Sequence, residues 1–98
     1  MRAEIARERG AALRPLEKRI AELEGAIVNA ETELARLYEE MESASESCDG
    51  GAIADLSQKI HARRKEVEAC FKLLEAVNLK YEARKAPFDL RMRELEED

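Results

Sequence analysis

The sequence predicts an all-α fold, a two-helix antiparallel coiled-coil hairpin, and three observations support it. Apolar residues recur every seven positions in two separate segments, which places an apolar stripe along each of two long helices. The stretch at residues 44–51 contains Ser, Asp and paired Gly, which is typical of a turn. Residues 20–46 are rich in Glu and residues 59–85 in Lys and Arg, and this opposite bias favours pairing within one chain.

The first half of the chain is expected to contain a leader and a long helix. Residues 1–14 form a basic helical leader that is loosely attached, because the heptad pattern does not extend into it and both Gly10 and Pro15 weaken a continuous helix. The first helix is expected at residues 15–43. Apolar residues fill its two inward positions, namely Leu13, Ile20, Ile27, Leu34 and Met41 at one and Leu16, Leu23, Ala30 and Leu37 at the other.

The second half is expected to contain the turn, a second helix and a tail. Asp49, within the turn at 44–51, is suited to cap the second helix, which is expected at residues 52–86. Pro87 ends or kinks that helix, and residues 87–98 form a helical tail that keeps the heptad phase. One inward position is apolar throughout, with Ile53, Ile60, Val67, Leu74, Tyr81, Phe88 and Leu95.

Arginines occupy the second inward position of this helix, at Arg63, Arg84 and Arg91. We expect their stems to lie along the edge of the seam while each guanidinium reaches water or a carboxylate. A basic strip directed at a partner is the alternative.

The composition is typical of one small domain built as an exposed helical rod. The 98 residues are 40% charged and 4% aromatic, without Trp, and the net charge is −5. Two helices bury a single seam, so a second copy packing alongside to form a four-helix dimer stays open. No apolar run approaches the roughly 20 residues of a membrane span, and the N-terminus lacks an apolar signal core, so we expect a cytoplasmic protein without membrane contact.

Candidate catalytic residues are few. His61 lies off the seam without a neighbouring ligand at metal spacing, and one His with two distant Cys does not make a zinc site. Cys70 lies roughly 28 Å from the tip of the hairpin at about 1.5 Å per residue, which is too far for a disulfide with Cys48 in the turn. Free thiols fit a cytosolic protein. We expect no enzyme, no metal and no cofactor.

Two groups of residues match a known module. They are Arg14, Pro15, Leu16, Lys18, Arg19, Ile20, Leu23 and Glu24 at the entry to the first helix, and Ile53 and Leu56 at the start of the second. With these residues, the stretch 11–76 resembles the C-terminal coiled-coil domain of ABC-F ATPases, the soluble, duplicated ABC proteins. The ATP-binding motifs of the family are absent, so the resemblance implies an excised domain or a stand-alone relative, with ATP-binding domains of a parent chain as one partner.

The resemblance implies contact with DNA or ribosomal RNA, through phosphate contacts from basic helix faces. The residues expected to make these contacts are Arg14, Lys18, Arg19, Arg63, Arg64, Lys65, Arg84 and Lys85. The same residues also fit a solvent-exposed basic face whose charge complements that of the Glu-rich helix. A structural protein–protein adaptor or oligomerisation hairpin, without nucleic-acid binding, is the alternative function.

Overall fold

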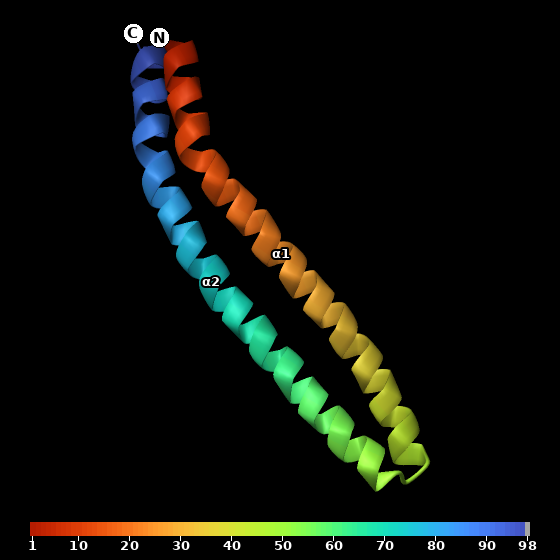
Figure 1. Ribbon diagram of the computed structural model, residues 1–98. Coiled ribbons are helices and arrows are strands. Elements are labelled where there is room, and N and C mark those ends of the chain that lie inside the picture. Colours follow the sequence, from red (N-terminus) through yellow and green to blue (C-terminus); the bar gives the residue numbers. More distant parts are fainter. Residues whose placement is uncertain (98) are drawn as a thin grey trace. The chain divides into compact units, whose positions relative to one another are not determined.

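The computed structural model describes residues 1–97 as two long α-helices joined by a short connection (Figure 1). Helix α1 spans Arg2–Glu46 and helix α2 spans Gly50–Glu97. Over these residues the structure contains no β-strand. The predicted all-α helical hairpin is confirmed, whereas the pairing of two hairpins stays a prediction.

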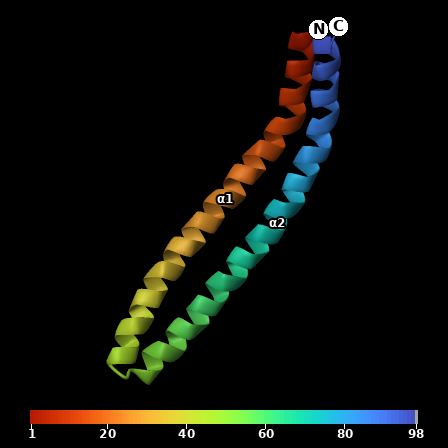
Figure 2. The ribbon, with the colours of Figure 1, turned by 180° about the vertical axis from the view of Figure 1, so that it is seen from behind.

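The chain divides into two compact units. The loop unit contains residues 23–72, including the connection, and the terminal unit contains residues 1–22 and residue 73 onward. In the terminal unit the two helices are antiparallel, because Glu8 contacts Arg91 while Glu17 contacts Tyr81. The beginning of α1 and the end of α2 therefore lie side by side (Figure 2).

The loop unit is built around one apolar cluster. Its buried members are Leu37 and Ala44 from α1 and Leu56 and Ile60 from α2. Further buried side chains on α1 within this unit are Leu23, Ile27 and Ala30, which stand at the inward positions that the heptads predict. Close packing of this kind is what stabilises a two-helix seam.

Helix α1 continues past its predicted end at residue 43 to Glu46. Ala44, which we assigned to the turn, lies seven residues after Leu37 and is buried in the same cluster. Burial of the Ala44 side chain stabilises an additional turn of helix at this end. The helix then closes with a Schellman motif, in which the Asp49 N–H donates to the Ala44 carbonyl at 3.1 Å and the Cys48 N–H donates to the Ser45 carbonyl at 3.2 Å.

The connection places Cys48 in the left-handed region, with φ of 56°, where glycine is normally preferred. Asp49 follows, and its Oδ1 accepts a hydrogen bond from the Ala52 N–H at 3.1 Å. The predicted cap on α2 is confirmed, and the helix begins at Gly50, slightly before the predicted residue 52.

In the terminal unit both helices run through their prolines. Helix α1 begins at Arg2 and contains Pro15, so the leader and the predicted first helix are one element. Ile5 and Leu13 are only 5% and 0% exposed, and their burial offsets the hydrogen bond that Pro15 cannot make. The seam thus extends into the segment that we expected to be loosely attached. Pro87 likewise lies inside α2.

The inward face of α2 differs from the heptad expectation at three arginines. Arg63, Arg84 and Arg91 are all exposed, whereas Lys85 and Met92 are half-buried. An α-helix has 3.6 residues per turn, so its inward face drifts by about 20° per heptad against a strict seven-residue repeat. In the terminal unit, the second inward residue is therefore the fourth after Tyr81 and after Phe88, where Lys85 and Met92 stand. It is not the third, where the arginines stand.

Candidate interaction surfaces

The predicted nucleic-acid-binding residues fall into both units. Seven of the eight are exposed and Lys85 is half-buried. The terminal unit contains Arg14, Lys18, Arg19, Arg84 and Lys85, and the loop unit contains Arg63, Arg64 and Lys65. In the loop unit the three are consecutive residues of α2 and therefore point to different sides of that helix, and in the terminal unit they arise from both helices.

Acidic partners engage several basic side chains of the terminal unit. Arg91 pairs with Glu8 across the helices at 2.8 Å. Asp89 lies between Lys85, at 3.3 Å along α2, and Arg9 of α1, at 3.8 Å. These pairs are solvent-exposed and individually contribute about 0–1 kcal/mol. Their main consequence is that positive potential at this end is locally cancelled.

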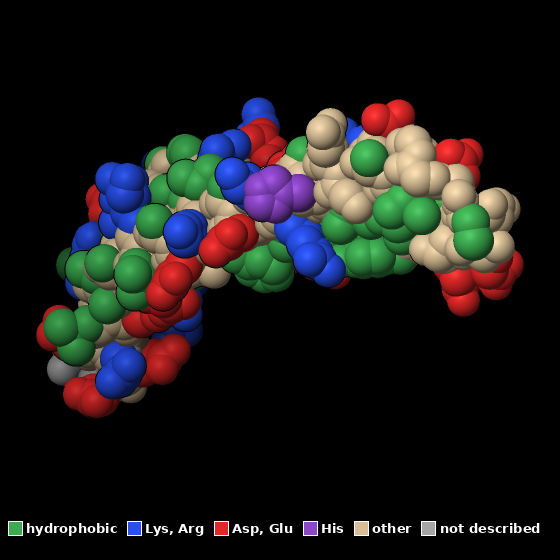
Figure 3. Space-filling model, turned by 90° about the horizontal axis from the view of Figure 1, so that it is seen from below, with side chains coloured by type: hydrophobic (Ala, Val, Ile, Leu, Met, Phe, Trp, Pro, Cys, Tyr) green, Lys and Arg blue, Asp and Glu red, His purple; other side chains and the backbone are tan. Residues whose placement is uncertain are grey.

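The charge balance differs between the units. The sequence of the terminal unit carries eleven basic and eleven acidic residues, while that of the loop unit carries six basic and eleven acidic residues. Neither unit has the excess of positive charge that marks most phosphate-binding surfaces. In the face shown in Figure 3, Lys and Arg side chains are interspersed with acidic and apolar ones.

Five members of the predicted set make no ion pair within residues 1–97, namely Arg14, Lys18, Arg64, Lys65 and Arg84. Arg14 and Lys18 stand one turn apart on α1, so their side chains are neighbours on the helix surface. This pair is the part of the predicted site that is best placed to meet an anion.

Arg64 is held by an aromatic side chain across the loop unit. Its Nε donates a hydrogen bond to the Tyr38 hydroxyl at 2.7 Å, and its guanidinium lies 5.4 Å from the centre of the Tyr38 ring. A cation over an aromatic face contributes about 0.5–1 kcal/mol at exposed sites. The guanidinium of Arg64 therefore connects the two helices of the loop unit.

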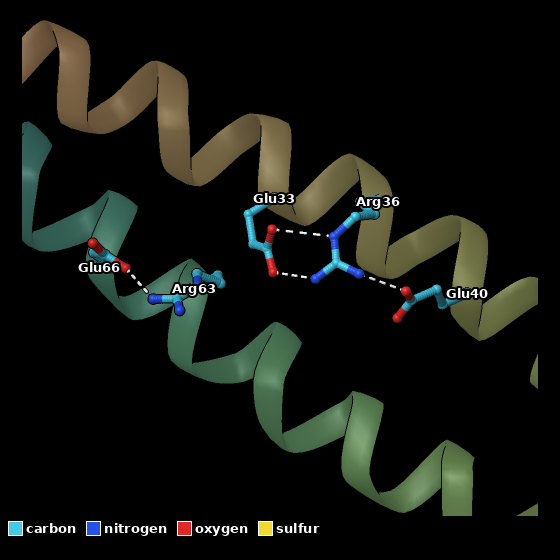
Figure 4. A network of polar contacts seen from close by, with 5 residues as sticks. All are labelled: Glu33, Arg36, Glu40, Arg63 and Glu66. Carbon is cyan, nitrogen blue, oxygen red and sulfur yellow. Dashed lines mark hydrogen bonds and ion pairs between the residues drawn. The ribbon is translucent and has the colours of Figure 1, made fainter.

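A polar network in the loop unit consists of two sets of contacts, one along α1 and one along α2 (Figure 4). Arg36 bonds to Glu33 and Glu40 along α1, and Arg63 bonds to Glu66 along α2. The hydrogen bond from Arg36 lowers the pKa of Glu33, and the positive charges of Arg63 and Lys59 on the other helix act in the same direction. Arg63, expected at the seam edge, is thus partnered on its own helix.

The chemistry available for catalysis is sparse. His61 is exposed (Figure 3), Cys48 is an exposed free thiol and Cys70 is a half-buried one. No group of His, Cys, Asp and Glu in the described chain is arranged to hold a metal ion. Neither helix, over residues 1–97, has a stretch apolar and long enough to cross a bilayer.

An apolar surface on α2 escaped the sequence analysis. Ala76, Leu79, Ala83, Ala86 and Leu90 are spaced three and four residues apart, and all five are exposed. We call these five residues the outer seam. Leu79 is 68% and Leu90 53% exposed. The signal was present in the sequence, but the stronger inward heptad occupied the same segment and concealed it.

Comparison with known proteins identifies no relative, since no family model, no curated protein and no solved structure matches this chain. The resemblance to ABC-F C-terminal domains therefore stays a prediction.

Proposed function

We propose that this chain is a non-catalytic helical-hairpin module that binds another protein helix through the outer seam of α2. The observation that carries this proposal is the heptad spacing of five exposed apolar side chains on a helix that already has an inward seam. Sustained three- and four-residue spacing is what a helix needs to pack along a second helix. Contiguous exposed apolar surface also marks interaction sites in soluble proteins.

The geometry of the outer seam suits a helical partner. Leu79 and Leu90 project large apolar side chains, and the alanines between them allow a second helix backbone to approach closely. Full burial of one leucine is worth about 1.5–3 kcal/mol. Two such side chains together with three alanines support a specific but weak contact. The proposal includes no enzyme activity and no cofactor, and places the protein in the cytoplasm, which its two free thiols support.

A second candidate function is phosphate contact with DNA or ribosomal RNA, as the ABC-F resemblance implies. The specific observation in its favour is the pair Arg14 and Lys18, which have no ion-pair partner within residues 1–97. A titration with labelled DNA and RNA at two salt concentrations tests it. Binding that weakens steeply with salt and is lost in Arg14→Gln/Lys18→Gln supports nucleic-acid contact, and no binding at low salt removes it.

The primary proposal is tested by site-specific photo-crosslinking in cells that make the protein. A photoreactive amino acid replaces Leu79 in one variant and Asn78 in the other, which is exposed but lies off the outer seam. We expect protein adducts from position 79 and few from position 78. Equal adducts from both positions, or nuclease-sensitive adducts only, would contradict binding through the outer seam.

A further inference from the structure

The outer seam has flanks of opposite charge. With about 100° of rotation per residue, Glu75 and Glu82 stand on one side of the outer seam, and Lys80 and Arg84 stand on the other. Towards the end of the helix the order reverses, because Arg93 stands on the side of the glutamates and Glu94 on the side of Lys80. All six residues are exposed and belong to the terminal unit.

This arrangement complements itself when two copies align in parallel. A two-fold axis along the outer seam places each flank of one helix against the opposite flank of its partner at the same level. Glu75 and Glu82 then face Lys80 and Arg84 of the second copy, and Arg93 faces Glu94. An antiparallel pair centred on Ala83 brings Glu82 against Glu82 of the other copy, where like charges repel.

The remaining acidic residue of this flank does not disturb the parallel pair. Asp89 stands two turns after Glu82 on the same side of the helix, but it is engaged by Lys85 and by Arg9 within its own chain. Its charge is therefore balanced before a partner arrives. The six flanking charges named above, none of which has an ion-pair partner within residues 1–97, match in parallel.

We propose that the partner of the outer seam is a second copy of this chain, with the two α2 helices parallel and in register. This inference rests on the proposed function, because both use the same surface, and it names the occupant. Leu79 packs against Leu79 of the partner and Leu90 against Leu90, while Ala76, Ala83 and Ala86 permit close approach of the two backbones.

Sedimentation equilibrium on the purified chain tests the association, over about 5–500 μM. We expect a monomer–dimer equilibrium, and Leu79→Glu should raise its dissociation constant by at least about tenfold, since the carboxylate would be buried at the contact. Asn78→Glu is the matched control, because it adds the same charge at an exposed position away from the outer seam. Helicity measured by circular dichroism verifies that both variants fold.

Disulfide formation tests the orientation, in a background that carries Cys48→Ser and Cys70→Ala. In the parallel pair the two copies of residue 90 lie within disulfide reach, about 7 Å between Cα atoms, so Leu90→Cys should form covalent dimers. In an antiparallel pair, a mixture of Ala76→Cys and Leu90→Cys chains should crosslink instead. The antiparallel result would overturn the proposed orientation.

The two proposals fail in different ways. A wild-type chain that is monomeric at 500 μM, or that dimerises equally well with Leu79→Glu, overturns self-association. If position 79 still yields adducts to a different protein in cells, the proposed function survives with another occupant. If position 79 yields no preferential protein adducts and the purified chain is monomeric, both proposals are wrong.

Discussion

The loop unit and the terminal unit use the same two helices in different ways. In the loop unit, Leu56 and Ile60 of α2 are buried against α1, and Phe71 is the one large apolar side chain of α2 that is exposed. In the terminal unit no described side chain of α2 is buried, and most of its apolar residues are divided between the inward face and the outer seam. When a helix divides its apolar residues between two faces, one neighbouring helix buries fewer of them. The second face then stays exposed and available to another helix.

The two units also differ in their net charge and in how their basic side chains are paired. The loop unit has excess acid, and its Arg36 and Arg63 pair with carboxylates on their own helices, namely Glu33, Glu40 and Glu66. The terminal unit is balanced and joins its helices by exposed ion pairs such as Arg91 with Glu8. Exposed ion pairs contribute little, so we expect the terminal unit to open more readily than the loop unit. The following predictions test this difference, beginning with the largest expected effect.

Truncation of the central leucine of the loop unit should have the largest effect. Leu37 is 1% exposed, and Leu37→Ala should lower the free energy of unfolding by about 2–5 kcal/mol, through lost burial and a residual cavity. Chemical denaturation measures it. Leu79→Ala is the control and should change the stability of the monomer by less than about 0.5 kcal/mol, because Leu79 is exposed. Similar losses in both variants would contradict the described core.

Removal of the proline in α1 should strengthen the terminal unit. Pro15→Ala restores a backbone donor and relieves crowding in the preceding turn, so we expect stabilisation of about 1–3 kcal/mol. Hydrogen exchange resolved by residue should show slower exchange in the terminal unit and little change at residues around Leu37. Faster exchange near residue 15 would mean that the proline is required by the native backbone.

Replacement of Cys48 should stabilise the loop unit through the connection. The positive φ at this position costs a residue with a side chain roughly 1–2 kcal/mol, and glycine avoids the cost. Cys48→Gly should therefore raise the melting temperature, and Cys48→Asn should raise it less, since asparagine tolerates this conformation better than most residues. Thermal melts under reducing conditions provide the measurement. A lower melting temperature for Cys48→Gly would contradict the left-handed assignment.

Acid should weaken the polar network by a small amount. The pKa of Glu33 lies below its ordinary value of 4.5, chiefly because of the hydrogen bond from Arg36. The folded state therefore binds this proton less readily than the unfolded state. Its contribution is present above pH 4.5 and is lost as the pH falls through the lowered pKa.

Thermal melts between pH 7 and 3 measure this loss, which Glu33→Gln should reduce. Glu39→Gln, at an exposed carboxylate outside the network, is the control. An identical pH dependence in the wild type and Glu33→Gln would show that the network makes no contribution.

The sequence predicted the inner seam well and the outer surfaces poorly. Ile27, Leu37 and Ile60 are buried where the heptads place them. Ile5 was missed because it stands seven residues before Ala12, a small residue that gives a weak signal. Arg84 and Arg91 were assigned inward because a strict seven-residue repeat ignores the drift of a real helix. The basic residues could be named from sequence, but their pairing with particular acids could not.

Local chemistry explains what the sequence determined by itself. Helix propensity, apolar spacing, the capping Asp49 and the residues of the turn act over a few positions, so two helices and their inward stripe follow directly from the chain. Only the tertiary structure decided that Arg64 rests on Tyr38, that Asp89 lies between two cations and that Leu79 and Leu90 stay exposed. These features depend on how the two helices are rotated and spaced within each unit, and no residue specifies that rotation alone.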